Sequence, residues 1–200
     1  MKILLIGGTG TLGTTVAKRL ESDHELISVG HTSGDLQTDI SDPEAIKNLF
    51  EEVGKVDAVV VTTGSAPMKP LKEMTNDDFL EGVESKMMGQ INVALTAMDY
   101  LNKGGSITLT SGILSDDPIP QGTILSTVNS AVNGFVAGSN GEFNRQNIRI
   151  NVVSPGLVED SAEALGDYFP GHHPVAMERV ATAYEKSVLG LVSGEIIKVW

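Results

Sequence analysis

Cysteine is absent from the 200 residues of this chain, and aromatic residues make up only 4% of it. Without cysteine the chain has no disulfide, no thiolate nucleophile and no thiolate metal ligand, which is typical of a cytoplasmic protein. Basic residues are also scarce, because 14 Lys and Arg stand against 26 Asp and Glu, for a net charge of -12. Phosphates would be repelled and bases would find few aromatic platforms, so neither nucleic acid nor an anionic membrane is an expected partner.

Long apolar runs and histidine clusters are missing as well. No run approaches the ~18 apolar residues of a membrane-spanning helix, and residues 1–6 lead straight into glycines without a signal-peptide cleavage pattern. The chain has 4 histidines, and the adjacent His172 and His173 lack a set of further ligands, so we expect no metal site. With 40% apolar and 20% charged residues, the composition predicts one globular domain over residues 1–200.

Strand-like and helix-like segments alternate along the chain. Short apolar runs predict strands, and longer segments with helical spacing predict helices, one of them capped by Asp42. The predicted strands are residues 3–6, 25–29, 56–62, 106–110, 148–153 and 195–199. The predicted helices are residues 14–21, 43–52, 76–101 (one helix or two), 124–143 and 175–189, and residues 154–174 are interpreted as a loop. This order predicts an α/β fold, a doubly wound parallel sheet with helices on both faces.

The strongest motif is Gly-Gly-Thr-Gly-Thr-Leu-Gly at residues 7–13, directly after the first predicted strand and before a helix. Glycine allows a sharp turn and lets a pyrophosphate approach the backbone, where the free N–H groups of the helix start face the anion. The alternative is a tight structural turn without a ligand, but strand, turn and helix together are the context that the motif requires. The pattern predicts a Rossmann-type domain that binds a dinucleotide. The expected contacts are Gly7, Thr9, Gly10, Thr11, Leu12 and Gly13.

The glycine spacing resembles that of the short-chain dehydrogenase/reductase family, particularly its extended and atypical branches. Three further motifs follow in the family's order, so the resemblance spans essentially the whole chain. Residues 62–64, Thr-Thr-Gly, stand where the family has Asn-Ala-Gly, and residues 39–40, Asp-Ile, stand where its acid and apolar residue flank the adenine. Residues 154–156, Ser-Pro-Gly, match its Pro-Gly turn near the nicotinamide. The resemblance implies cofactor contacts at Asp39, Ile40, Thr63, Gly64, Pro155, Gly156 and Val158.

The end of the second predicted strand bears on the choice of nucleotide. Domains that bind NAD usually place an acid there, which accepts a hydrogen bond from the ribose 2′-hydroxyl. Residues 29–34 read Val-Gly-His-Thr-Ser-Gly, without a carboxylate and also without an arginine. His31, Thr32 and Ser33 could instead hold a 2′-phosphate, so NADP(H) is favoured over NAD(H). The alternative is that His31 is an ordinary solvated loop residue.

The family's chemistry uses a Tyr that moves the proton, a Lys that lowers its pKa, a Ser that orients the carbonyl and an Asn that supports a water relay. Ser111 matches the Ser. Residues 125–135 align with the family's Tyr-x-x-x-Lys helix, but Leu125 stands at the Tyr position and Asn129 at the Lys position. Lys86 stands at the position of the Asn. The chain is therefore identified as a short, atypical member that lacks the Tyr-x-x-x-Lys pair.

Two interpretations of this exchange remain open. In the first, Lys86 points toward Ser111 and the nicotinamide with Asn129 as its partner, and burial lowers its pKa so that it acts as the acid. This predicts an NADP(H)-dependent oxidoreductase that acts on a small carbonyl or alcohol substrate. In the second, Lys86 is a surface lysine and the chain is a catalytically inactive NAD(P)-binding sensor or regulatory protein.

Two further features concern the substrate and the assembly. Tyr168 and the two adjacent histidines lie in the segment that covers the substrate in this family, so they either supply a proton or are exposed loop residues. The helix predicted within residues 76–101 has more apolar surface than one face of a sheet requires, and residues 124–143 are rich in Ala, Val and Gly. The family commonly pairs these two helices with a neighbouring subunit, which implies a homodimer or homotetramer. The alternative is that both helices pack only within the chain.

Overall fold

Seven parallel strands form one sheet in the order β3-β2-β1-β4-β5-β6-β7. The computed structural model describes all 200 residues. The strands are β1 (Lys2–Ile6), β2 (Glu25–Gly30), β3 (Leu36–Gln37), β4 (Val56–Val61), β5 (Leu101–Thr110), β6 (Arg149–Pro155) and β7 (Ile196–Val199). From β1 the chain winds through β2 and β3 to one edge, and from β4 to β7 toward the other. The predicted doubly wound, Rossmann-like α/β fold is therefore confirmed.

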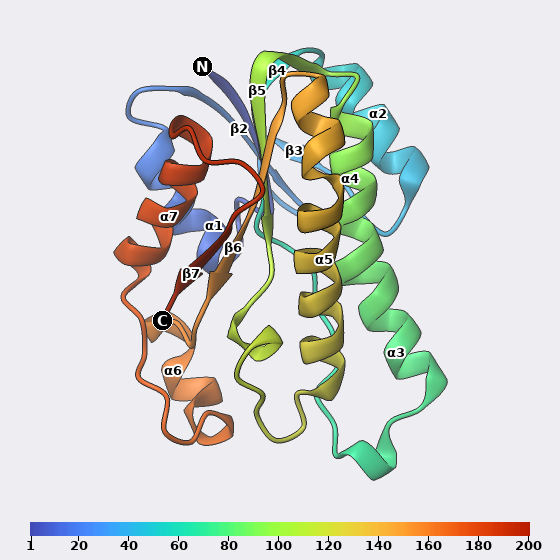
Figure 1. Cartoon of the computed structure of the whole chain (residues 1–200), viewed down its shortest axis with the longest axis vertical. Helices are drawn as coiled ribbons and strands as arrows, with labels where there is room; N and C mark the ends of the chain where they lie inside the picture. The colour runs from blue at the N-terminus through green and yellow to red at the C-terminus, as the bar shows by residue number, and fades with distance from the viewer.

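Helices cover both faces of this sheet (Figure 1). One face carries α1 (Thr11–Leu20) and α7 (Met177–Leu189), and the other carries α2 (Pro43–Val53), α4 (Gly89–Ala97) and α5 (Thr123–Arg145). A π-helix, Val83–Met88, joins α3 (Asn76–Gly82) to α4. Short 3-10 helices span Leu71–Glu73, Ile113–Ser115 and Gly166–Tyr168, and α6 spans Glu159–Leu165. No helix is both long enough and apolar enough to cross a membrane.

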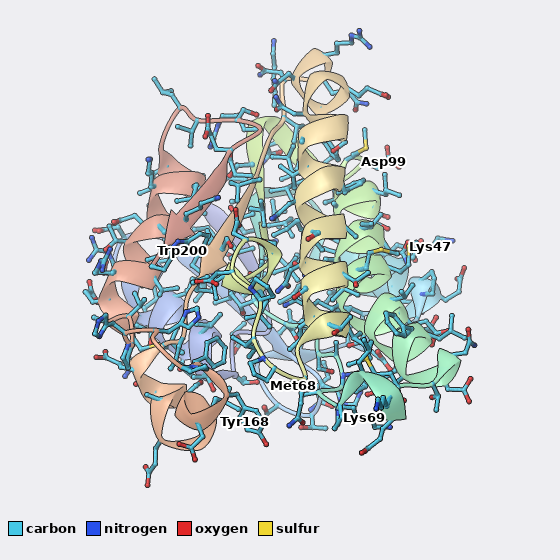
Figure 2. The ribbon with its side chains drawn as sticks, turned by 60° about the horizontal axis from the view of Figure 1, so that its bottom comes forward. Lys47, Met68, Lys69, Asp99, Tyr168 and Trp200 are labelled. Carbon is cyan, nitrogen blue, oxygen red and sulfur yellow. The ribbon has the colours of Figure 1, made fainter.

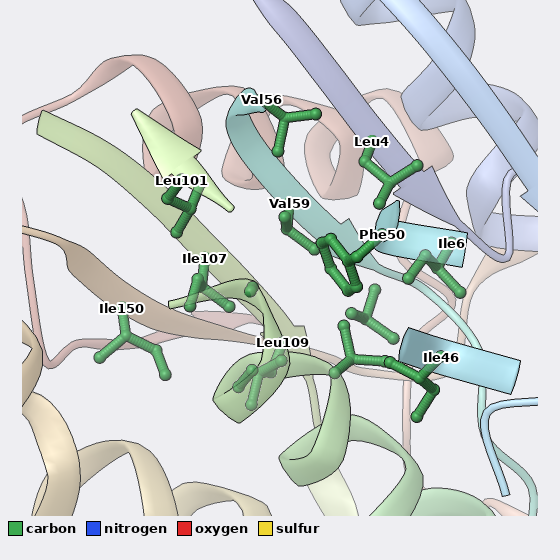
Figure 3. Close-up of a cluster of buried hydrophobic side chains, with 14 of the residues drawn as sticks. Leu4, Ile6, Ile46, Phe50, Val56, Val59, Leu101, Ile107, Leu109 and Ile150 are labelled. Carbon is green, nitrogen blue, oxygen red and sulfur yellow. The ribbon is translucent and has the colours of Figure 1, made fainter. Parts of the chain in front are cut away.

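Alternate side chains of each strand point to opposite faces of the sheet, so the strands contribute to two cores. In β1, Leu4 and Ile6 belong to the core on the side of α2, α4 and α5, together with Phe50 of α2 (Figure 3). Ile3 and Leu5 belong to the core on the side of α1 and α7. Because both faces are buried, strands such as β4, Val-Asp-Ala-Val-Val-Val, are almost continuously apolar.

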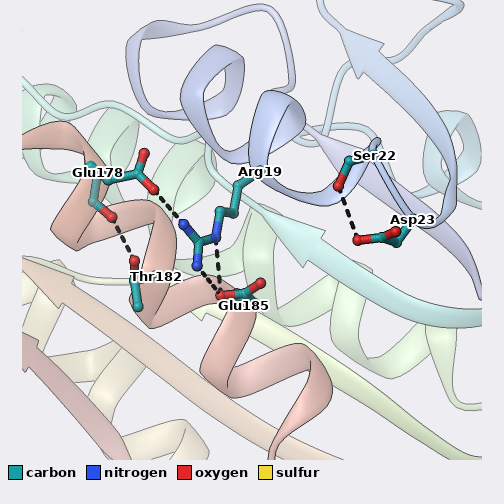
Figure 4. A network of polar contacts seen from close by, with 6 residues as sticks. All are labelled: Arg19, Ser22, Asp23, Glu178, Thr182 and Glu185. Carbon is teal, nitrogen blue, oxygen red and sulfur yellow. Dashed lines mark hydrogen bonds and ion pairs between the residues drawn. The ribbon is translucent and has the colours of Figure 1, made fainter.

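The two helices on one face, α1 and α7, are joined at the surface by Arg19 (Figure 4). Its Nε and Nη2 atoms donate to the Glu185 carboxylate at 3.0 and 2.7 Å, and its Nη1 atom donates to Glu178. Ion pairs of this kind add little to stability, because water and salt screen them. They help to orient α1, whose first turn contains the last residues of the glycine-rich segment.

Most predicted elements are present, with shifted ends. The helix predicted from residue 14 begins at Thr11, and the helix predicted over residues 43–52 is confirmed, with the Asp42 carboxylate accepting from the Glu44 N–H at 2.9 Å. The helical segment predicted over residues 76–101 ends at Ala97, because Leu101 already belongs to β5. A two-residue strand such as β3 is too short to leave a periodic signal.

The interpretation of residues 154–174 as a loop is wrong. Ser154 and Pro155 complete β6, and the segment then forms α6 and the 3-10 helix Gly166–Tyr168. Two acidic residues, Glu159 and Asp160, stand in the first turn of α6, where they suit the positive end of a helix dipole. The flanking prolines, glycines and histidines conceal this short helix in the sequence.

Candidate functional site

A cavity of about 500 Å³ opens at the carboxyl ends of the strands, where the sheet reverses its winding direction between β1 and β4. Ligands of doubly wound sheets bind at this switch point. The walls come from the segments that follow β1, β2 and β4. They are Ile6, Gly7, Thr11, Leu12, Gly30, His31, Thr38, Asp39, Ile40, Thr62, Thr63, Gly64, Ser65 and Ser85.

The glycine-rich segment shapes one wall of this cavity. Gly7 has a φ of 91°, in the region that favours glycine, and its N–H donates to the Val29 carbonyl at 2.7 Å. A Cβ atom on Gly13 would lie 1.9 Å from the Gly7 carbonyl oxygen, so only glycine lets α1 approach the turn this closely. Gly10 caps α1 without a side-chain hydrogen bond, and the first turn has no acidic residue. The N–H groups that begin α1 are therefore free to bind an anion.

A smaller and more apolar hollow of about 180 Å³ adjoins the cavity, because Thr11 and Leu12 line both. The other lining residues come from the end of β6, the turn after it, α6 and the end of the following 3-10 helix: Pro155, Gly156, Leu157, Val158, Ser161, Leu165 and Phe169. A Cβ atom on Gly156 would lie 3.0 Å from the Cβ of Trp200, so the end of the chain packs beside this turn. Figure 2 shows Trp200, Met68 and Tyr168 with this edge of the molecule turned forward.

The turn after β2 closes the opposite end of the cavity. A Cβ atom on Gly30 would lie 2.4 Å from the Ser33 carbonyl and 2.5 Å from the Thr9 hydroxyl, so no side chain fits there. His31 is exposed, with its Nε2 atom 3.8 Å from the Asp39 carboxylate. Hydrogen bonds from the Ser41 hydroxyl and N–H hold the pKa of Asp39 below its usual value, and His31 adds to this. Thr32 and Ser33 are exposed beside the cavity without lining it.

Lys86 lies in the π-helix and is only 7% exposed, so the alternative of a surface lysine is wrong. A Cβ atom on Gly64 would lie 2.9 Å from the Lys86 Cα, which places the Lys86 backbone behind the wall that Gly64 forms. Burial lowers the pKa of Lys86 to about 8. Its ammonium group makes no hydrogen bond or ion pair within the chain. π-Helical turns occur frequently at functional sites.

Ser111 and Asn129 also carry buried polar groups without partners. Ser111 follows β5, and its N–H donates to the Val153 carbonyl at 3.0 Å, while its hydroxyl oxygen has no partner. Asn129 lies on α5, where its Nδ2 atom is 3.1 Å from the place of a Cβ on Gly112, and its Oδ1 atom has no partner. Buried polar atoms are rarely left without partners, but neither residue lines the cavity or the smaller hollow.

Like Lys86, the other three candidate proton donors, Tyr168, His172 and His173, are absent from the lining of the cavity. Leu125, in the first turn of α5, packs against an apolar cluster that includes Leu157 and Phe169. The His172 ring packs edge-on against Phe169 at 5.3 Å and lies 3.6 Å from the Asp117 carboxylate, with 11% of its side chain exposed. Tyr168 and His173 are exposed.

One buried tyrosine was overlooked in the sequence. Tyr184 of α7 lies on the far face of the sheet, with its hydroxyl 2.6 Å from the Thr110 hydroxyl, and burial raises its pKa. The cavity residues Thr38, Ser65 and Ser85 were also missed. Each of them follows the end of a strand or lies in a helix beside such an end. This position could have indicated them, because ligands of doubly wound sheets bind at the carboxyl ends of the strands.

Comparison with known proteins identifies relatives over most of the chain. A family model described as enoyl-(acyl carrier protein) reductase matches residues 10–184. Hydroxynaphthalene reductase arp2 of Aspergillus fumigatus is 28% identical over 163 residues, which are 78% of this chain and 60% of that protein. The chain thus spans about 60% of the length of this relative.

Solved structures similar to this protein also cover the whole chain. The protein lin1944 from Listeria innocua has a TM-score of 0.98 and 46% identity, with 100% of both chains covered. A small-chain dehydrogenase in complex with NADPH has a TM-score of 0.88 and 28% identity, with 100% of this chain and 96% of that chain covered.

Proposed function

This chain belongs to the short-chain dehydrogenase/reductase family, and we propose that residues 1–200 form one domain that acts as an NADP(H)-dependent oxidoreductase on a small carbonyl or alcohol. The observation that carries the proposal is the buried, unpaired Lys86 directly behind the Gly64 wall of the cavity. A lysine kept partly neutral in this place can exchange a proton at neutral pH.

The cavity has the features that a nicotinamide dinucleotide requires. Free N–H groups at the start of α1 suit the diphosphate, and the apolar hollow beside Leu12 suits the nicotinamide ring. When bound, the nicotinamide supplies or accepts the hydride. The residues proposed to hold the cofactor are Gly7, Thr9, Gly10, Thr11, Leu12, Gly13, His31, Thr32, Ser33, Asp39, Ile40, Thr63, Gly64, Pro155, Gly156 and Val158.

The turn after β2 supports NADP(H) over NAD(H). Gly30 leaves no space for a carboxylate that would accept from the ribose 2′-hydroxyl. The Thr9 hydroxyl lies beside Gly30, and the exposed His31, Thr32 and Ser33 offer further donors to a 2′-phosphate. The 28% identical small-chain dehydrogenase was solved in complex with NADPH, which supports the same preference.

In the proposed reaction the proton comes from Lys86. Leu125, at the family's Tyr position, has no proton to transfer, and Asn129 stands at its Lys position. The Ser111 hydroxyl donates a hydrogen bond to the carbonyl oxygen of the substrate, and the Lys86 ammonium donates a proton to that oxygen as the alcohol forms. Asn129, buried on α5 with an Oδ1 atom that has no partner, is proposed as the residue that accepts a hydrogen bond from Lys86 during the reaction. In alcohol oxidation the neutral amine of Lys86 accepts the proton instead.

The test combines binding with turnover. NADPH oxidation is followed against a panel of small aldehydes, ketones and quinones, for the wild type and for Lys86→Met. We expect turnover of at least one carbonyl compound, and a loss of about 10²- to 10⁴-fold in kcat when the general acid is removed. Tight NADPH binding without turnover of any substrate would overturn the proposal in favour of an inactive sensor.

We also propose that the protein is a homodimer or homotetramer that pairs α4 and α5 with a second copy. The support is an apolar side chain in the last turn of α4, Leu95, which is 50% exposed. On α5 the space around Gly134, Gly138 and Gly141 is open, which would allow close helix approach. Light scattering of the wild type and of Leu95→Glu tests this proposal, and a monomeric wild type contradicts it.

A further inference from the structure

Gln90 is a completely buried polar residue that connects the helix of Lys86 with the strand of Ser111. It is 0% exposed and lies four residues after Lys86, at the start of α4. Its Oε1 atom accepts from the Thr110 N–H at 2.7 Å, and its Nε2 atom donates to the Thr110 carbonyl at 2.8 Å. The same Nε2 atom donates to the Lys86 carbonyl at 3.1 Å. One side-chain amide thus joins the two chain segments that carry the proposed catalytic groups.

The strand side of this connection replaces a missing backbone neighbour. The last pair between β4 and β5 is Val60 with Thr108, so β4 offers no ladder partner to Thr110. The amide of Gln90 bonds both the N–H and the C=O of Thr110, as a neighbouring strand would. Burying these two backbone groups without partners would destabilise the fold. On its other side β5 is held by β6, through Thr110 with Val153.

The helix side of the connection stabilises an irregular turn. The Gly89 N–H donates to the Glu84 carbonyl, five residues earlier, as in a π-helix. This wider turn shifts the hydrogen-bond register, and the Lys86 carbonyl accepts from the side chain of Gln90. The π-helical turn also brings the Lys86 Cα against Gly64. A lysine placed by a normal α-helical turn would have a different direction and depth.

We propose that Gln90 is a positioning residue that holds Lys86 at its depth behind the cavity by tying the Lys86 turn to Thr110 at the end of β5. The proposal rests on the role of Lys86 in the proposed function, but it concerns the connection between the two segments and not the chemistry itself. Gln90 acts only through Lys86 and Thr110, because its amide has no access to the cavity. Loosening the connection would admit water to the ammonium group and bring its pKa back toward the usual value of lysine.

The test replaces Gln90 by Met, which keeps the size of the side chain and removes all three hydrogen bonds. The titration of Lys86 is followed by NMR of protein labelled with ¹³C at the lysine Cε, which needs no turnover. We expect the midpoint of Lys86 to rise by one pH unit or more in Gln90→Met. We also expect kcat for carbonyl reduction to fall about tenfold to a hundredfold, as misplaced groups do, with KM for NADPH unchanged.

The matched control is Thr108→Val, which removes a buried hydrogen bond of the same strand, between the Thr108 and Ser187 hydroxyls at 2.7 Å. This variant should lose stability without moving the Lys86 midpoint. If Gln90→Met does not fold, Gln90→Asn keeps an amide one methylene shorter and should shift the midpoint in the same direction. An unchanged midpoint in the folded Gln90 variant overturns the proposal. A wild type that turns over no carbonyl contradicts only the proposed function, since the titration still decides the role of Gln90.

Discussion

Lys86 lies so close to Gly64 that a Cβ atom on Gly64 would come within 2.9 Å of the Lys86 Cα. Gly64 has a φ of 119°, a backbone conformation that residues with a side chain rarely adopt. The first residues after β4 and the π-helix are therefore in direct contact. Through this contact, the wall of the proposed cofactor cavity lies directly against the residue proposed to donate the proton.

Gly64→Ala should damage both stability and cofactor binding. The added methyl group meets the Lys86 backbone, and the unfavourable φ adds strain of about 1–3 kcal/mol. The control is Gly54→Ala, because Gly54 has a φ of 71° but no atom within 4 Å of the place of its Cβ. Urea unfolding and calorimetric NADPH binding measure the two effects. We expect weaker NADPH binding for Gly64→Ala alone, and equal binding by both variants would refute a role for the contact.

Lys86→Met should make the protein more stable at neutral pH, even though it removes activity. The folded state lowers the pKa of Lys86 from 10.5 to about 8. The buried charge therefore destabilises the fold by on the order of 3 kcal/mol below pH 8. As the pH rises from about 8 to about 10.5, the folded protein releases its proton before the unfolded chain does, and this penalty disappears.

Urea unfolding of the wild type and of Lys86→Met at pH 7 and pH 10 checks this prediction. The difference between the two proteins isolates Lys86, because other groups that titrate in this range are common to both. The stability gap should be large at pH 7 and small at pH 10. A gap that is the same at both pH values would mean that Lys86 is solvated.

The rate of carbonyl reduction should fall above pH 8. Reduction requires the protonated ammonium of Lys86, and its pKa of about 8 sets the alkaline limb of kcat/KM for the free enzyme. Alcohol oxidation requires the neutral amine, so its rate should rise over the same range. Stopped-flow or steady-state assays between pH 6 and pH 10 measure both directions. The alkaline limb of the pH profile should be absent from Lys86→Met. It should remain in Lys72→Met, which replaces an exposed lysine.

His31→Asp should reduce the preference for NADP(H). The new carboxylate beside Gly30 can accept from a ribose 2′-hydroxyl and repels a 2′-phosphate. We expect the Kd for NADPH to rise about tenfold or more, equivalent to ~1.4 kcal/mol, and the Kd for NADH to fall. His31→Ala serves as the control, since it removes a donor to the phosphate without offering an acceptor to the hydroxyl. If calorimetry finds no change in either Kd for His31→Asp, the 2′-position of the ribose does not lie beside His31.

Local patterns were sufficient to predict the fold class. The apolar runs of β1, β4 and β6, the glycines between β1 and α1 and the Asp42 cap of α2 are short-range signals, because each depends on neighbours in the sequence. They identified the parallel sheet, the order of the elements and the turn proposed to hold the diphosphate. The same signals were too weak for the two residues of β3 and for α6.

Whether Lys86 is a surface residue or a buried one could not be decided from the sequence. Its depth depends on a π-helical turn and on contact with Gly64, which is 22 positions before Lys86. It also depends on the hydrogen bonds of Gln90 to Thr110, which is 24 positions after Lys86. The sequence by itself determined the α/β layers and the glycine turn, since these follow from the spacing of nearby residues. The tertiary structure alone decided which polar side chains are buried, because burial is set by segments that meet only after the chain has folded.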